Sequence, residues 1–296
     1  MEALTTKKST KILLAAGLAL VLAAGALLAV LVVRHEKAQS ARFAELSAEI
    51  FRLQEENRRL AETAGGEETA RALRDLQARI IRLEAANAYG QSDYGYLAVG
   101  NSITLHPVNE VWWQAAGMAA SAKEKDFVHR VADALSESKG TVGLQAVYFL
   151  DWETGAPDRA SALKQLDPYL DPRIRLITLQ LGENVTDKTT FEADFEALIR
   201  YLEEKAPEAR ILVIDNFFPD AEMTEMKKTA AENTGAAFVS LAALQGDASL
   251  RAGAGAVVYD EEGNSHLIER PDVAEHPGDE GMRRIAEAVL EALADE

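Results

Sequence analysis

Five strand-length apolar runs, alternating with helical stretches over residues 95–294, constrain the fold of this chain most strongly. The run Arg210-Ile211-Leu212-Val213-Ile214 is typical of them. Continuous apolar strands are typical of a parallel sheet, because helices bury both of its faces. We predict strands at 95–99, 142–150, 173–181, 209–215 and 236–241. We predict helices at 122–137, 158–166, 189–205, 220–233 and 279–294. This alternation predicts an α/β fold, a three-layer α/β/α sandwich with a mostly parallel sheet of about five strands.

Polar residues follow three of these predicted strands. Gly100-Asn101-Ser102 comes after the first strand, Gly182-Glu183-Asn184 after the third, and Asp215-Asn216 after the fourth. In open parallel sheets, ligands bind beyond the carboxyl ends of the strands. We therefore expect these three segments to lie together at one edge of the sheet and to form the functional site.

A histidine precedes the last predicted helix, in the segment Glu275-His276-Pro277-Gly278. Serine, asparagine and histidine, in this order along the chain, can supply a nucleophile, a donor to an oxyanion and a general base. The ordinary histidine pKa of about 6.5 suits the role of a base. His106 lies nearer to Ser102 in the sequence and is the rival candidate for the base.

These three segments resemble the sequence blocks of the SGNH (GDSL-like) hydrolase family, and the resemblance extends over residues 94–296. It implies a flavodoxin-like SGNH hydrolase fold and ester hydrolysis through an acyl-serine. Under this resemblance Ser102 is the nucleophile and His276 is the base. Asn184 and the backbone N–H of Ser102 bind the oxyanion, with Gly117 as the candidate for a third donor.

The sequence departs from the family pattern at two positions. Asn101 stands where the family usually has an aspartate, and Val273 stands where the family's acid usually lies, three residues before the histidine. We predict that Asp272 reaches the imidazole through a bulge in the loop and completes a catalytic triad. The alternative is a Ser–His dyad, in which a backbone carbonyl orients the imidazole. Glu275 adjoins His276, so its side chain is expected to point away.

Two adjacent tryptophans, Trp112 and Trp113, follow the serine segment. Neighbouring side chains point in different directions on a helix or a strand, so we expect one of the two to belong to the core. The other is a candidate for substrate binding, by stacking on a sugar ring or by covering an acyl group.

Residues 12–33 carry no charge. A helix of this length crosses a hydrocarbon core of about 30 Å, so we expect a transmembrane helix that acts as an uncleaved signal anchor. A buried soluble helix and a cleaved signal peptide are the alternatives. The short basic tail at residues 1–11 places the N-terminus in the cytoplasm. We therefore expect a single-pass protein of the cell membrane, with its catalytic domain on the extracytoplasmic side.

Residues 34–88 are charged and favour helix, with apolar residues spaced alternately three and four apart. One heptad stripe includes Asn57, and a second, out of phase with it, begins after Gly65-Gly66. The pattern predicts a coiled coil, which makes a homodimer or binds a partner helix. A folded-back hairpin and an amphipathic helix packed on its own domain are alternatives. A linker at 89–94 precedes the predicted hydrolase domain at 95–296.

The composition excludes several classes of function. The formal net charge of −17 argues against nucleic acid as a partner. The absence of cysteine excludes disulfides, thiolate metal sites and a cysteine nucleophile. No His, Asp and Glu residues have metal-ligand spacing, so we expect neither a metal nor another cofactor.

From these features we expect a membrane-anchored serine esterase that acts on carboxylic esters, such as O-acetyl groups on cell-surface glycans. The choice of glycan rests on family analogy and location alone. An O-acyltransferase would use the same residues. The alternative from another class is a non-catalytic envelope or cell-division scaffold, in which the α/β domain only binds.

Overall fold

The computed structural model describes residues 49–50, 52–54, 56 and 67–294. By its internal contacts the chain divides into two units, residues 1–80 and 81–296, and the second holds the α/β domain. Helix α2 (Glu67–Gly90) runs across this division. It extends beyond the predicted end of the coiled coil into the predicted linker, and β1 begins at Tyr94.

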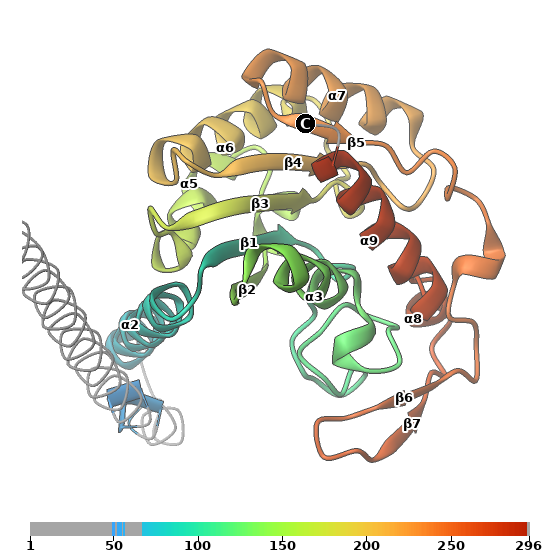
Figure 1. Ribbon diagram of the computed structural model, residues 1–296, viewed down its shortest axis with the longest axis horizontal. Coiled ribbons are helices and arrows are strands. Elements are labelled where there is room, and N and C mark those ends of the chain that lie inside the picture. Colours follow the sequence, from blue (N-terminus) through green and yellow to red (C-terminus); the bar gives the residue numbers. More distant parts are fainter. Residues whose placement is uncertain (1–48, 51, 55, 57–66, 295–296) are drawn as a thin grey trace, which may run out of the picture. The chain divides into compact units, whose positions relative to one another are not determined.

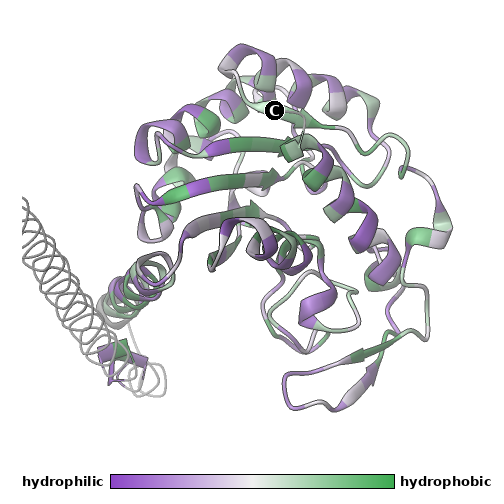
Figure 2. Cartoon of the chain, in the orientation of Figure 1, coloured by the Kyte–Doolittle hydropathy of each residue, from purple (hydrophilic) through white to green (hydrophobic). Residues whose placement is uncertain are grey.

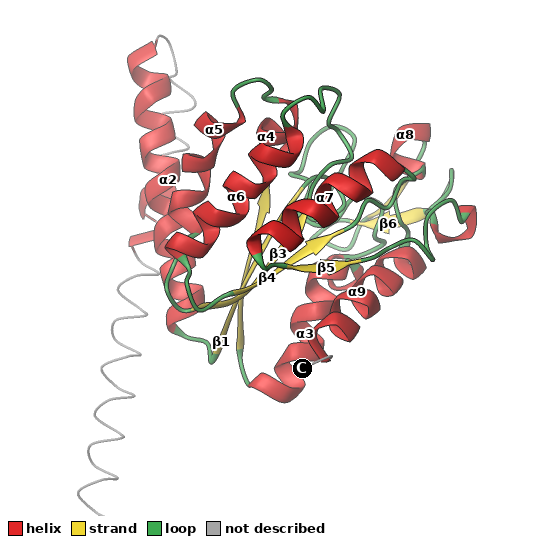
Figure 3. Ribbon diagram, turned by 90° about the horizontal axis from the view of Figure 1, so that it is seen from above, coloured by secondary structure: helices red, strands yellow, loops and turns green. Residues whose placement is uncertain are grey.

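The centre of the domain is a five-stranded sheet whose hydrogen-bonded neighbours are all parallel. The strands lie in the order β2-β1-β3-β4-β5. Figure 3 draws the strands in yellow. They are β1 (Tyr94–Gly100), β2 (Val142–Tyr148), β3 (Ile174–Gln180), β4 (Arg210–Ile214) and β5 (Ala237–Val239). This is the flavodoxin-like strand order, in which the connections diverge between β1 and β3. The predicted α/β architecture is confirmed.

Helices cover both faces of the sheet, as Figure 1 shows. On one face lie α3 (Phe127–Lys139) and α9 (Asp279–Ala294), packed on Tyr96 and Ala98 of β1. The other face is covered by α4 (Leu150–Thr154), α5 (Arg159–Ala162), α6 (Phe191–Lys205) and α7 (Ala221–Thr234). These helices pack on Leu97 and Val99, the alternate residues of the same strand. Figure 2 shows the result as largely apolar strands between helices that each carry one polar side.

The structure differs from the sequence-based prediction in the start of one helix and in several short elements. The helix expected at 122–137 begins at Phe127, because the Asp126 side chain caps it by accepting a hydrogen bond from His129 N–H. The antiparallel pair β6 (Val257–Tyr259) and β7 (Ser265–Leu267) and helix α8 (Pro271–Ala274) were not predicted. Elements of three or four residues are too short to produce a periodic signal.

The predicted location in the cell membrane requires correction. Among the residues that the structure describes, no helix has the length and apolar character needed to cross a membrane. The predicted span, residues 12–33, and the tail before it lie outside the described residues. The predicted single-pass location with an extracytoplasmic catalytic domain is therefore not borne out.

Two segments within the described part of residues 34–88 are in contact, although they are distant in sequence. Arg79 forms an ion pair and hydrogen bond with Glu49, thirty residues earlier in the same chain. This contact is expected for a folded-back hairpin. Asn57 and most of the coiled-coil stripe that includes it lie outside the described residues, so pairing between two chains stays a prediction.

Candidate functional site

The candidate site lies where three loops leave neighbouring strands. Ser102 follows β1, Asn184 follows β3, and Glu153 follows β2 in helix α4. Since β1 lies between β2 and β3, the parallel strands deliver all three residues to the same edge of the sheet. This is the position at which open α/β sheets bind ligands.

Ser102 and His276 are in direct contact, although 174 residues separate them in sequence. Ser102 Oγ lies 2.7 Å from His276 Nε2, and His276 Nδ1 lies 2.9 Å from the backbone oxygen of Asp272. A carbonyl oxygen only accepts hydrogen bonds, so Nδ1 carries the ring proton. Nε2 is then free to accept the proton of the serine hydroxyl. This tautomer is the one that a general base for Ser102 requires.

The surroundings of His276 keep its imidazole neutral. Burial lowers the pKa of His276 below its ordinary value, and the nearby His106 lowers it further, while the bond to the Asp272 carbonyl opposes both effects. The Phe218 ring meets the imidazole edge-on, with 6.1 Å between ring centroids. A neutral imidazole can take up a proton, which a cation cannot.

Asp272 contacts the histidine through its backbone and not through its carboxylate. The carboxylate is 62% exposed and accepts two hydrogen bonds from Arg270, at 2.9 and 2.6 Å. The prediction that the Asp272 side chain completes a triad is therefore not supported by the geometry, and the backbone-carbonyl alternative fits it. Glu275 is paired with Arg251.

Asn184 follows β3 and is exposed, and a hydrogen bond to Glu153 fixes its side chain. Its Nδ2 donates to Glu153 Oε2 at 2.7 Å. An amide nitrogen carries two hydrogens, so one remains for an oxyanion. Gly182, two residues earlier, has a φ of 127° and lies close to Asn216 and Met223, where a Cβ would collide. Glycine is therefore required at the turn that presents Asn184.

Gly117 does not supply the third oxyanion donor that the sequence predicted. Its N–H donates to the buried Asp126 Oδ2 at 3.0 Å, so this hydrogen is already engaged. A Cβ at this position would lie 2.5 Å from the backbone oxygen of Ile103, so close packing explains why this residue is a glycine. The next residue, Met118, donates its N–H to the backbone oxygen of Ser102 at 2.7 Å and anchors the nucleophile loop.

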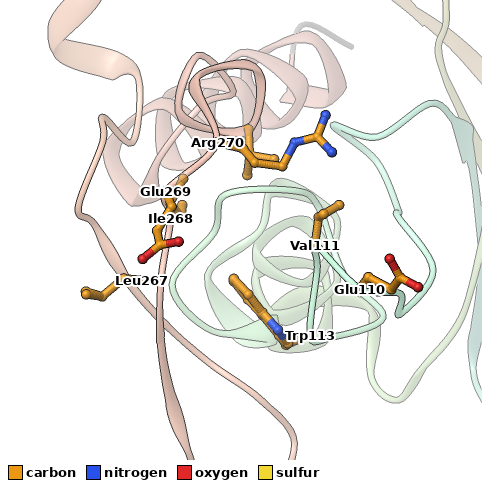
Figure 4. Close-up of a pocket in the computed structure, with 8 residues that line it drawn as sticks. Glu110, Val111, Trp113, Leu267, Ile268, Glu269 and Arg270 are labelled. Carbon is orange, nitrogen blue, oxygen red and sulfur yellow. The ribbon is translucent and has the colours of Figure 1, made fainter.

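The two tryptophans have different environments, as expected. Trp112 is fully buried in a small core beneath β6 and α8. Trp113 is partly exposed and stacks on His266, with 4.4 Å between ring centroids and 7° between planes. Trp113 also lines a pocket of about 130 Å³, shown in Figure 4. The pocket is lined by Glu110, Val111, Trp113, Leu267, Ile268, Glu269, Arg270 and Val273.

A buried lysine, Lys227, contacts the loop that carries Asn184, and sequence reasoning did not identify it. Lys227 of α7 is fully buried, and its Nζ donates to the Leu181 carbonyl at 2.6 Å and to Asn216 Oδ1 at 2.9 Å. Burial lowers the pKa of Lys227 and raises that of Glu183, and the opposite charges of the two partly offset these shifts. Helical spacing alone would identify only an apolar face of α7.

Glu153 was also not identified from the sequence. It is 1% exposed and lies five residues after the end of β2. The available signal was a pair of acidic residues, Asp151 and Glu153, beside the large apolar residues Phe149, Leu150 and Trp152 directly after β2. The sequence offered no indication of which loop this carboxylate would face.

Comparison with known proteins gave matches only among solved structures. No protein-family model matches the chain, and no curated protein matches it. A phospholipase A1 from Streptomyces albidoflavus NA297 is similar at 15% identity and a TM-score of 0.45, covering 68% of this chain and 99% of that one. A two-domain esterase active on acetylated mannans is similar at 14% identity and a TM-score of 0.45, covering 72% of this chain and 52% of that one. A family two carbohydrate esterase from Clostridium thermocellum is similar at 15% identity and a TM-score of 0.44, covering 69% of this chain and 64% of that one.

This chain therefore spans less than two thirds of the length of both carbohydrate esterases. In strand order and in the Ser102, Asn184 and His276 segments, the α/β domain resembles the SGNH hydrolases.

Proposed function

We propose that this protein is a serine hydrolase of carboxylic esters that acts through an acyl-serine intermediate. One observation carries the proposal, the 2.7 Å contact between Ser102 Oγ and a His276 Nε2 whose tautomer is set by a backbone carbonyl. A serine hydroxyl becomes an effective nucleophile when an adjacent base takes its proton.

The reaction follows from this geometry. Ser102 Oγ attacks the ester carbon while its proton passes to His276 Nε2, and the carbonyl oxygen becomes an oxyanion. The free N–H of Asn184 and the Ser102 N–H bind this charge. The oxyanion then collapses, the bond to the alcohol breaks, and the alcohol leaves with the proton from Nε2. Water repeats the sequence on the acyl-serine, which releases the acid and restores Ser102.

For the substrate class we propose acyl groups on carbohydrate. The Trp113 pocket supports this choice, because it combines one aromatic ring with the charged side chains of Glu110, Glu269 and Arg270. Aromatic rings pack on the apolar face of a sugar, while charged groups bind its hydroxyls. The same residues would pass the acyl group to a sugar hydroxyl in place of water, which product analysis distinguishes.

A serine-directed fluorophosphonate and an aryl acetate test the proposal on the purified protein. The wild-type protein and Ser161→Ala, which changes an exposed serine of α5 that the proposed reaction does not use, are expected to react with both compounds. Ser102→Ala is expected to react with neither. Equal labelling of wild type and Ser102→Ala would place the reactive serine elsewhere in the chain, and no labelling of either would favour the non-catalytic binding domain. Release of free acid identifies hydrolysis, and acylated sugar identifies transfer.

A further inference from the structure

Glu153 is a buried carboxylate that the proposed reaction does not use directly. It lies on α4 between Trp152 and Thr154, and its side chain points to the loops after β1 and β3. Burying a carboxylate is costly unless hydrogen bonds or opposite charges compensate it. At Glu153 the compensation comes from hydrogen bonds that the carboxylate accepts.

Three donors converge on Glu153, and they come from the two loops that form the site. Oε1 accepts from Asn101 Nδ2 at 3.2 Å and from the backbone N–H of Gly182. Oε2 accepts from Asn184 Nδ2 at 2.7 Å. Asn101 directly precedes the nucleophile, and Asn184 is the proposed oxyanion donor. One carboxylate therefore connects the loop after β1 to the loop after β3.

These contacts fix which way the Asn184 amide faces. Both Glu153 oxygens accept, so the Asn184 side chain must turn its NH₂ group toward Glu153. The second hydrogen of that NH₂ group is then directed away from the carboxylate. If an amide replaced the carboxylate, one of its two positions would become a donor and would face another donor.

We propose that Glu153 is a positioning residue that sets the orientation of the Asn184 amide and the spacing between the Ser102 and Asn184 loops. This inference rests on the proposed function, since it concerns the oxyanion donor of that reaction. Positioning of this kind acts on the transition state, where charge develops, more than on the bound ester.

The test compares Glu153→Gln with Asp151→Asn in the full chain. Asp151 lies on the same helix but is exposed, so it is the matched control. We expect Glu153→Gln to lower kcat by about 10²-fold, the loss that misplacing a group by about 1 Å can cause. KM is expected to stay nearly constant, and Asp151→Asn is expected to behave as wild type. A loss confined to KM, or no loss, would overturn the proposal.

A double variant separates positioning from a general loss of structure. Asn184→Ala alone is expected to cost roughly 10²–10³ in kcat, the usual loss for one oxyanion donor. If Glu153 acts through Asn184, the combined loss in Glu153→Gln/Asn184→Ala is smaller than the product of the two single losses. Losses that simply multiply would show that Glu153 acts elsewhere, and would overturn the proposal.

A measurement without substrate keeps this inference separate from the proposed reaction. The side-chain amide signal of Asn184 in ¹⁵N NMR spectra is identified by its absence in Asn184→Ala. We expect Glu153→Gln to move this signal and Asp151→Asn to leave it in place. Glu153→Asp, which keeps the charge but shortens the side chain, gives a second reading if the glutamine variant does not fold. An unmoved signal overturns the positioning role even in an active enzyme, whereas a moved signal in a protein whose Ser102→Ala variant keeps full activity overturns only the proposed function.

Discussion

At the scale of single residues, the choice of acceptor for His276 Nδ1 determines which carboxylates matter. The acceptor is the Asp272 carbonyl, and the Asp272 carboxylate is paired with Arg270. We expect Asp272→Asn and Glu275→Gln to stay within about twofold of wild type, because surface substitutions change energies by about 0.5 kcal/mol or less. In a well-formed triad, changing the aspartate costs about 10⁴-fold.

Steady-state kcat/KM values of the two variants, measured beside His276→Ala, check this prediction. His276→Ala is expected to be as damaging as Ser102→Ala, since nucleophile and base act as one unit. A severe loss in Asp272→Asn would mean that its carboxylate leaves Arg270 and binds the imidazole during the reaction.

The pH dependence of the reaction reports the environment of His276. The neutral imidazole is the reactive form, and burial lowers its pKa. Because a lowered pKa keeps the base neutral to lower pH, the fall of kcat/KM on the acid side of the pH profile is expected to have its midpoint below about 6.5, the ordinary histidine pKa. His106→Gln removes a neighbouring imidazole that lowers this pKa, and is expected to move the limb upward. Loss of activity in His106→Gln would instead identify His106 as the base.

At the scale of elements, α7 supports the loop that carries Asn184. Lys227→Met would leave the Leu181 carbonyl and Asn216 Oδ1 without this donor, and would leave Glu183 without its opposite charge. A buried acceptor left without its donor costs about 1–3 kcal/mol, so we expect the free energy of unfolding to fall by at least this amount.

Urea denaturation of Lys227→Met and of Lys228→Met measures this cost. Lys228 is the next residue of the same helix and is exposed, so its substitution is expected to change stability by no more than about 0.5 kcal/mol. Equal midpoints for the two variants would show that the buried lysine does not stabilise the fold.

The elements also show how far sequence reasoning reaches. The apolar run at 210–214 predicts β4 because a central parallel strand is buried on both faces, and β3 follows the same rule. Ser102 and His276 were identifiable because they directly adjoin a strand end and a helix start. Glu153 and Lys227 were not, because their roles depend on which loops meet in space. For His276 the sequence left open whether the Asp272 carboxylate or a backbone carbonyl orients the imidazole. Gly117 shows the same limit, since only the structure reveals that Asp126 already binds its N–H.

At the scale of the whole molecule, the chain joins an N-terminal unit, residues 1–80, to a unit that holds the α/β domain, residues 81–296. The domain contains all the residues of the candidate site. For the N-terminal unit, the sequence left open whether helices pair between two chains or fold back within one. The Glu49–Arg79 contact favours the fold-back, and Gly65-Gly66 stands next to residue 64, the midpoint between the two in sequence.

The absence of cysteine makes this choice directly testable. We expect the variant Glu49→Cys/Arg79→Cys, treated with a short bismaleimide crosslinker, to give a product with the mass of one chain. The two side chains meet within a chain, and the protein has no other thiol to react. Each single-cysteine variant is the control and is expected to give no crosslink. Covalent dimers of Glu49→Cys alone would place residue 49 of two chains side by side, as a parallel coiled coil requires, and would contradict the fold-back.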